Sequence, residues 1–254
     1  MALTDFQRTI CRLLANHRIS SGESSRDIDL FHDTVEALEA SWAADRQLLG
    51  AHGFEVRVLR ERPSYVEAEI GRSGEVVLME WARDSAYRFF PLLEHPDLGL
   101  TLHPFDLATN KTLALVGRLE VRDWVDLIHA CERIQPLGYL AWAACGKDPG
   151  FSPKGILETA GKTARYSAEE VRGLAFAGES PVAEDLSRRW HAILGGAREI
   201  VDILPLLHLG RCVLTSTGDL FRGDATELQA AVDRDQLVFH PGRIGGAWPE
   251  IKQR

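Results

Sequence analysis

The sequence contains no long hydrophobic run, no closely spaced cysteine pair and no excess of positive charge. Its longest uncharged apolar stretch, Leu137 to Gly146, is far shorter than the roughly 20 residues that a membrane-spanning helix needs. The first residues include polar side chains where a secretory signal would need an unbroken apolar segment. We therefore expect no membrane partner and a cytoplasmic location.

The four cysteines, Cys11, Cys131, Cys145 and Cys212, are far apart in the sequence. This spacing indicates neither a disulfide framework nor a zinc knuckle, and it fits a reducing compartment. The chain has 29 basic and 37 acidic residues, which gives a net charge of −8. That balance excludes a protein that coats nucleic acid through bulk charge, although a local basic cleft could still hold one RNA end.

What the sequence does have is enough apolar material for a full core, because it is 254 residues long and 45% hydrophobic. Its hydrophobic periodicity predicts an α+β fold with a small mixed sheet and flanking helices, followed by a helical half and a small C-terminal α/β tail. The turn at Gly71–Gly74 predicts that the strands on either side are antiparallel. The expected strands are 27–31, 54–59, 65–70 and 75–81, with a small hairpin within 211–221, and the expected helices are 5–16, one that Thr34 caps, 105–117, 123–134, 137–145, 153–164, 181–204 and 226–232.

These elements predict three parts, a core at 1–102, a helical domain at 103–205 and a small hairpin-and-helix segment at 206–254. Four basic residues of the helical part form a candidate face for an RNA end, although ordinary surface charge on helices explains them more simply. They are Lys147, Lys154, Lys162 and Arg165.

Two carboxylates stand one residue apart in the first predicted strand. Side chains alternate along a strand, so Asp27 and Asp29 are expected on one face while Ile28 and Leu30 face a core. Two carboxylates on one face are a platform for Mg²⁺, which prefers oxygen ligands and takes its other positions from water and phosphates. An edge strand with a solvated acidic face is the alternative interpretation.

A third carboxylate, Glu80, lies near the end of the apolar strand 75–81. If that strand lies beside the strand of Asp27 and Asp29, Glu80 can complete a metal-binding triad for phosphoryl transfer. The alternative is a carboxylate at the rim of the sheet that pairs with Arg83 or Arg88.

These motifs and two later ones resemble the AbiEii/MenT-type branch of the nucleotidyltransferase superfamily. The later motifs are Asp106–Leu115, which contains Lys111, and Arg118–Leu127, which contains an Arg-Asp-x-x-Asp segment. With Ser25–Phe31 and Glu80, they follow in the family's order within about 5–165.

The resemblance implies a polymerase-beta-like nucleotidyltransferase core that uses Mg²⁺ or Mn²⁺ and a nucleoside triphosphate (NTP). The metal would lie on Asp27, Asp29 and Glu80, and the acceptor hydroxyl would be, for example, the 3′ end of tRNA. Members of this branch act as toxins, which implies an antitoxin protein as a partner. The residues implied in binding or transferring the nucleotide are Ser25, Arg26, Lys111, Arg122, Asp123 and Asp126.

Plainer interpretations of these residues stay open. Lys111 could be a surface lysine with its stem along the protein, and Asp123 could cap a helix that starts at Trp124. Arg122 could pair with Asp126 or Glu120.

The sequence also departs from the family pattern. It lacks the glycine turn and following helix that normally precede the Asp-x-Asp pair and cradle the triphosphate, since only 17–26 separate the first helix from the strand. The alternative function is therefore a catalytically inactive protein of the same fold that binds nucleotide, RNA or a partner protein.

Overall fold

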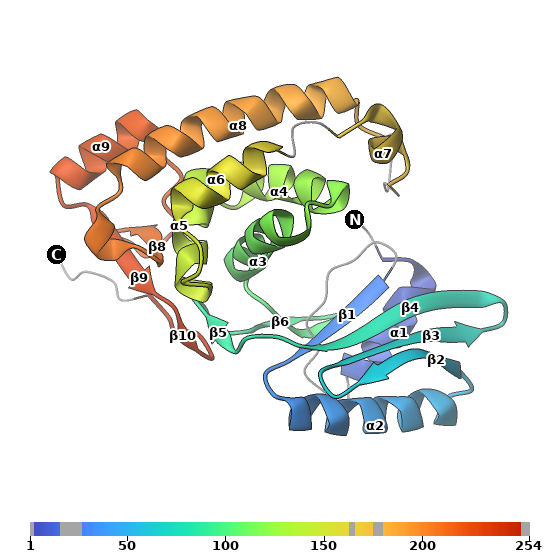
Figure 1. Cartoon of the computed structure of the whole chain (residues 1–254). Coiled ribbons are helices and arrows are strands. Elements are labelled where there is room, and N and C mark those ends of the chain that lie inside the picture. Colours follow the sequence, from blue (N-terminus) through green and yellow to red (C-terminus); the bar gives the residue numbers. More distant parts are fainter. Residues whose placement is uncertain (1–2, 16–26, 163–165, 175–179, 250–254) are drawn as a thin grey trace. The chain divides into compact units, whose positions relative to one another are not determined.

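The computed structural model describes residues 3–15, 27–162, 166–174 and 180–249, and their contacts group them into two units (Figure 1). The first unit comprises the described residues up to 86, together with 92–102. The second comprises the described residues of 87–91, 103–174 and 180–249. The α+β fold class is confirmed, whereas the three-part division at 102 and 205 stays a prediction.

The first unit is built on a four-stranded sheet in the order β1-β4-β3-β2. β1 pairs with β4 in parallel, while β4 with β3 and β3 with β2 pair antiparallel. The expected turn between β3 and β4 is confirmed, with Ser73 and Gly74 both at positive φ (55° and 86°), as a two-residue hairpin loop requires. Its elements are α1 (Asp5–Ala15), β1 (Asp27–His32), α2 (Val35–Ala51), β2 (Glu55–Arg62), β3 (Tyr65–Arg72), β4 (Glu75–Arg83), β6 (Leu93–His95) and β7 (Gly99–Thr101).

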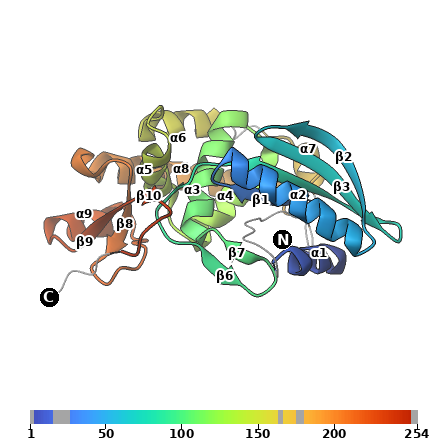
Figure 2. The ribbon, with the colours of Figure 1, turned by 90° about the horizontal axis from the view of Figure 1, so that it is seen from below.

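One face of this sheet carries the core of the first unit. Alternate residues of β3 and β4, among them Ala68 and Met79, are fully buried on that face. Helices α1 and α2 cover it and contribute to the same hydrophobic cluster, and Figure 2 shows α2 lying across the sheet. The predicted N-cap is confirmed, because the side chain of Thr34 accepts a hydrogen bond from the Ala37 amide. The other face of the sheet is left for polar side chains.

The second unit is organised around a helix that is buried on all sides. Every residue from Leu137 to Cys145 is buried, which explains the longest apolar stretch of the sequence. Among the described residues, no helix has both the length and the apolar character to cross a membrane. The elements of this unit are β5 (Tyr87–Arg88), α3 (Pro104–Arg118), α4 (Val121–Arg133), α5 (Leu137–Lys147), α6 (Pro153–Gly161), α7 (Ala168–Arg172), α8 (Ala183–Ile203), η2 (Leu206–His208), β8 (Arg211–Thr215), α9 (Ala225–Asp233), β9 (Leu237–Pro241) and β10 (Arg243–Ile244).

The end of α5 needs a glycine. A Cβ atom added to Gly146 would lie 2.2 Å from the carbonyl oxygen of Gly210, so the two backbones can approach each other only without side chains. Gly210 also has φ +77°, a left-handed conformation that favours glycine. Together these two glycines let the chain pass directly against α5 before it enters β8.

The pairing of the C-terminal strands differs from the prediction. The hairpin expected within 211–221 is reduced to an isolated bridge between Leu214 and Leu220. The main partner of β8 is instead β9, which follows α9 and was not predicted. The sequence between the two strands includes the whole of α9. Such a long-range pairing leaves no local turn signal in the sequence.

A buried ion pair holds the start of α3. The carboxylate of Asp106 has no exposed side-chain surface, accepts hydrogen bonds from the Phe89 and Phe90 amides, and lies 2.9 Å from Nζ of Lys147. Lys147 is only 7% exposed and also donates to the Asn110 side chain. The expectation of a surface role for Lys147 is therefore wrong, because its charge is turned inward to a buried carboxylate.

We expect Asp106→Asn to reduce the free energy of unfolding by about 3–5 kcal/mol, because the ammonium group of Lys147 would stay buried without its counter-charge. Urea unfolding would measure this loss. The double variant Asp106→Asn/Lys147→Met should recover part of the stability, since neither charge remains. An Asp106→Asn variant no less stable than the exposed control Glu199→Gln would show that the ion pair contributes nothing.

Candidate functional site

Asp29 and Glu80 are neighbours on the open face of the first unit's sheet. The parallel pairing of β1 with β4 places Asp29 directly opposite Glu80. The residues on either side of them in sequence, such as Leu30 and Met79, are buried in the core, so the two carboxylates belong to the opposite face, where both are half-buried. The sequence predicted a role for Glu80 only if its strand lies beside the strand of Asp29. The structure meets this condition.

The face around these two residues carries a third carboxylate and a phenol. Glu67 on β3 lies opposite Glu80, so Asp29, Glu80 and Glu67 form one row across three strands. The row ends at Arg60, whose Nε lies 3.8 Å from a carboxylate oxygen of Glu67. Tyr65 hydrogen-bonds to Glu80, and its pKa is raised by burial first and by that carboxylate second. The row thus brings three acidic side chains together, and Arg60 lies near one of them, Glu67.

The sequence left open an ion pair of Glu80 with Arg83. Among the residues that the structure describes, Glu80 and Arg83 form no such pair, and the contact of Glu80 within its unit is with Tyr65. Arg88, the other suggested partner, belongs to the second unit. Within the first unit, the carboxylate of Glu80 is thus held by a neutral donor.

The donor set of this face suits a hard divalent cation. Mg²⁺ is typically bound by one or two protein carboxylates, with water and phosphate oxygens completing its shell, and Asp29 and Glu80 supply two carboxylates from adjacent strands. Within the described part of the chain, no cluster of three His, Cys, Asp or Glu side chains is close enough to hold a metal ion. The Asp27 backbone is the first residue of β1, opposite Leu78, and its side chain lies outside the described residues.

A second group of charged residues lies in the second unit, on α3 and α4. Nζ of Lys111 on α3 lies 3.0 Å from a carboxylate oxygen of Asp126 and 3.4 Å from one of Asp123, both on α4. The Lys111 side chain is 24% exposed. The structure thus places Lys111 against two carboxylates, in place of the exposed surface lysine that was the plainer interpretation.

Asp123 is held by Arg118 at the turn between the two helices. Leu119, with φ 56°, ends α3 and turns the chain sharply into α4. Arg118 then reaches both oxygens of Asp123, Nε at 2.6 Å and Nη2 at 2.9 Å. Burial alone would raise the pKa of Asp123, but the hydrogen bonds from Arg118 and the charge of Lys111 outweigh it and lower this pKa below the ordinary value. The carboxylate therefore stays ionised although its side chain is fully buried.

The capping role suggested for Asp123 is wrong. α4 begins at Val121 with Glu120 at its N-cap, so Asp123 lies inside the first turn. There its charge still interacts favourably with the helix dipole. Arg122 lies half-buried in the same turn. Ser25 and Arg26, the other predicted nucleotide contacts, lie outside the described residues.

Sequence analysis missed Tyr65, Glu67 and Arg118 as members of these groups. Glu67 could have been found, because a two-residue loop at Ser73 and Gly74 fixes the register that places Glu67 opposite Glu80. Arg118 is the first residue of the Arg118–Leu127 motif, but the sequence assigned it no role. Nothing in the local sequence distinguishes it from an ordinary residue of the last helical turn, where basic side chains are common.

Replacing Arg118 should change the acid stability of the protein. Because the folded-state pKa of Asp123 is lowered, its contribution to stability is present above the ordinary pKa and is lost as the pH falls through the folded value. In Arg118→Gln the burial of Asp123 remains while its main donor is gone, so this pKa rises. On acidification, we expect the free energy of unfolding of Arg118→Gln to fall at a higher pH than that of the unmodified chain, within about pH 4–6.

Chemical denaturation across that pH range would measure the effect. Arg234→Gln is the control, because Arg234 is exposed and forms no ion pair with another described residue. Parallel acid profiles for Arg118→Gln and the unmodified chain would contradict the assignment.

Comparison with known proteins gives structural similarity only. No family model matches the sequence, and no curated protein matches it. A crystal structure from H. pylori, described as that of a nucleotidyltransferase, is 13% identical over 77% of this chain and 92% of its own, with a TM-score of 0.46. MenT4, a nucleotidyltransferase toxin from Mycobacterium tuberculosis, is 16% identical over 79% of this chain and 83% of its own, with a TM-score of 0.47.

Proposed function

We propose that this chain is a metal-dependent nucleotidyltransferase that transfers a nucleotide from an NTP to an acceptor hydroxyl. The observation that carries the proposal is the pairing of Asp29 with Glu80 on adjacent parallel strands, on the face that the core leaves free. Two half-buried carboxylates placed opposite each other repel, and a divalent cation bound to both relieves that repulsion. Binding of a divalent cation would explain why the two carboxylates are placed together.

In the proposed reaction the acceptor oxygen forms a bond to the α-phosphorus of the NTP. The bond from that phosphorus to the bridging oxygen of the β-phosphate breaks, pyrophosphate leaves, and the acceptor hydroxyl loses its proton. Bound Mg²⁺ or Mn²⁺ would supply charge stabilisation for the phosphates and their in-line geometry. Asp27, Asp29 and Glu80 would hold the cation, and we assign to Glu80 the further role of drawing the proton from the acceptor.

Lys111 is the proposed phosphate ligand of the second unit. Its ammonium group is held in place by Asp126 at 3.0 Å, and Asp123 is already neutralised by Arg118. A triphosphate carries more negative charge than one carboxylate and can therefore compete with Asp126 for this lysine. Ser25, Arg26 and Arg122 remain proposed nucleotide contacts on the strength of the sequence motifs.

The acceptor that we propose is the 3′ hydroxyl of an RNA, with tRNA as the first candidate. The net charge of −8 argues against broad nucleic-acid binding, and an enzyme that acts on one RNA end needs only a local contact. If such transfer inactivates tRNA, the protein is a toxin, and an antitoxin protein is its expected partner.

The test is transfer of label from each α-labelled NTP to total tRNA with Mg²⁺ or Mn²⁺. We expect Asp29→Asn and Glu80→Gln each to reduce incorporation at least about 100-fold, because each removes a charged metal ligand. Lys111→Met should raise the KM for the NTP. Glu69→Gln is the matched control, since Glu69 lies on the same strand face as Glu67 but is paired with Arg57.

A second measurement separates binding from transfer. Ligands that bind the folded state raise its melting temperature by mass action, so NTP with Mg²⁺ should stabilise the chain and stabilise Asp29→Asn less. Stabilisation without incorporation into any RNA would favour the inactive nucleotide-binding protein. If NTP with Mg²⁺ caused no stabilisation and no label were incorporated, the proposed function would be refuted.

A further inference from the structure

The sheet face that carries Asp29, Glu80 and Glu67 also holds a phenol to which the proposed reaction gives no role. Tyr65 is the first residue of β3 and lies opposite Ala82 on β4, two positions beyond Glu80. Because Ala82 is small, the long side chain of Tyr65 can reach its diagonal neighbour. Its hydroxyl donates a hydrogen bond to the carboxylate of Glu80. Tyr65 thus contacts a proposed metal ligand directly.

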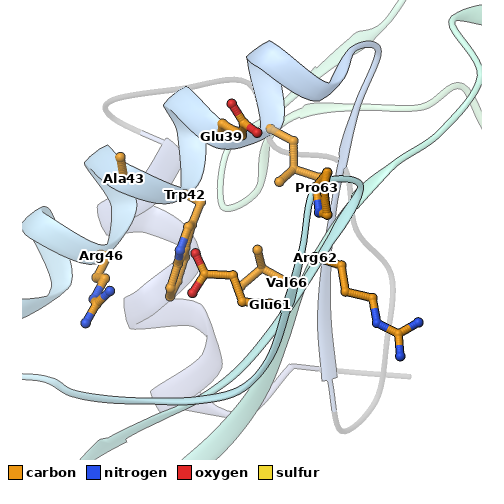
Figure 3. A pocket seen from close by; sticks show the side chains of 9 residues that line it. Glu39, Trp42, Ala43, Arg46, Glu61, Arg62, Pro63 and Val66 are labelled. Atoms are coloured by element: carbon orange, nitrogen blue, oxygen red, sulfur yellow. The ribbon is translucent and has the colours of Figure 1, made fainter.

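The orientation of Tyr65 follows from the residue after it. Val66 is 2% exposed and belongs to the core on the helix side of the sheet. On that side it lines, together with Trp42, a pocket of about 510 Å³ between α2 and the end of the β2–β3 hairpin (Figure 3). Successive side chains of a strand point to opposite faces, so Tyr65 lies on the other side of the sheet, with Glu67 and Glu80.

An irregularity in β2 brings a guanidinium group to the same face. The pairing of β2 with β3 shifts between Val58 and Arg60, which places Arg60 opposite Glu67. In a regular ladder that position would belong to Leu59. The guanidinium carbon of Arg60 lies 5.9 Å from the ring centroid of Tyr65, and its Nε lies 3.8 Å from a carboxylate oxygen of Glu67. A cation–π contact therefore supports the ring whose hydroxyl holds Glu80.

Glu80 needs support because its neighbours favour other positions of its side chain. It has carboxylates on both sides, Asp29 on β1 and Glu67 on β3, and like charges repel. Its side chain has several rotatable bonds and could turn toward Arg60, away from Asp29. A hydrogen bond to an ionised carboxylate is stronger than one between neutral groups. The hydroxyl of Tyr65 therefore restricts this rotation.

We propose that Tyr65 is a positioning residue for Glu80 and holds its carboxylate ready for the divalent cation and for the acceptor proton. The inference rests on the proposed function, because Glu80 is a proposed metal ligand. Tyr65 itself would contact neither the cation nor the substrate. Loss of a hydrogen-bond partner of a metal ligand typically costs about 10–100-fold in metal affinity or activity.

Binding of Mn²⁺ to the full chain tests the proposal without catalysis. Electron paramagnetic resonance measures free Mn²⁺, and the binding that Asp29→Asn removes defines the site. We expect Tyr65→Phe, which deletes only the hydroxyl, to raise the Kd of Mn²⁺ about tenfold. Tyr139→Phe is the matched control. It deletes a hydroxyl that donates to the Gly223 carbonyl in the second unit, so it should lower the melting temperature and leave the Kd unchanged.

A double-variant cycle separates positioning from a general effect on the fold. If Tyr65 acts through Glu80, Tyr65→Phe should change the Kd of Mn²⁺ less than about twofold in a Glu80→Ala background. In the transfer assay at saturating Mn²⁺, Tyr65→Phe should lower kcat about tenfold and change the KM for the NTP less than about twofold. Its melting temperature should stay close to that of the unmodified chain, because the ring is kept.

Two results would overturn the proposal while the proposed function stands. One is an unchanged Kd of Mn²⁺ in Tyr65→Phe, although Asp29→Asn abolishes both binding and transfer. The other is an equal effect of Tyr65→Phe with and without Glu80, which would make the role of the hydroxyl structural. If the unmodified chain bound no Mn²⁺ and transferred no nucleotide, the proposed function would fail together with this proposal.

Discussion

The candidate metal face depends on one constraint, the parallel pairing of β1 with β4. These strands are far apart in the sequence, and the chain between them forms α2, β2 and β3. Because side chains alternate along a strand, a shift of one residue in this pairing would leave Asp29 opposite a core residue of β4. The buried side chains of Ile28 and Leu30 fix the register, so the core of the first unit also sets the position of its carboxylates.

The second unit contains two buried aspartates with different chemistry. Asp106 satisfies two backbone amides and one buried lysine, and all of its partners are deep in the fold. Asp123 is held by Arg118, which is 52% exposed, and by Lys111, which also contacts Asp126. The first arrangement is closed and serves stability. The second is open to exchange of partners, which suits a residue group proposed to meet a phosphate.

The sequence predicted the local features of this fold well. Each of these features depends on a few residues that are close in the sequence. They are the alternation along β3 and β4, the cap at Thr34 and the glycine turn. The pairing of β8 with β9 could not be predicted, because it joins segments on either side of α9. Lys147 was misjudged for a related reason, since burial of a lysine depends on a distant carboxylate that local periodicity does not show. In the candidate site, the Asp29–Glu80 pair was anticipated conditionally, whereas the bond between Arg118 and Asp123 was not.

The last consequence concerns β2, the outer strand at one end of the sheet. Its free edge could in principle join the sheet of another molecule and extend it without limit. Five of its eight residues are charged (Glu55, Arg57, Arg60, Glu61 and Arg62), and its pairing with β3 is irregular between Val58 and Arg60. A second strand that approached this edge would meet closely spaced charges of both signs and a kinked backbone. The free edge of the first unit's sheet is thereby protected against uncontrolled self-association.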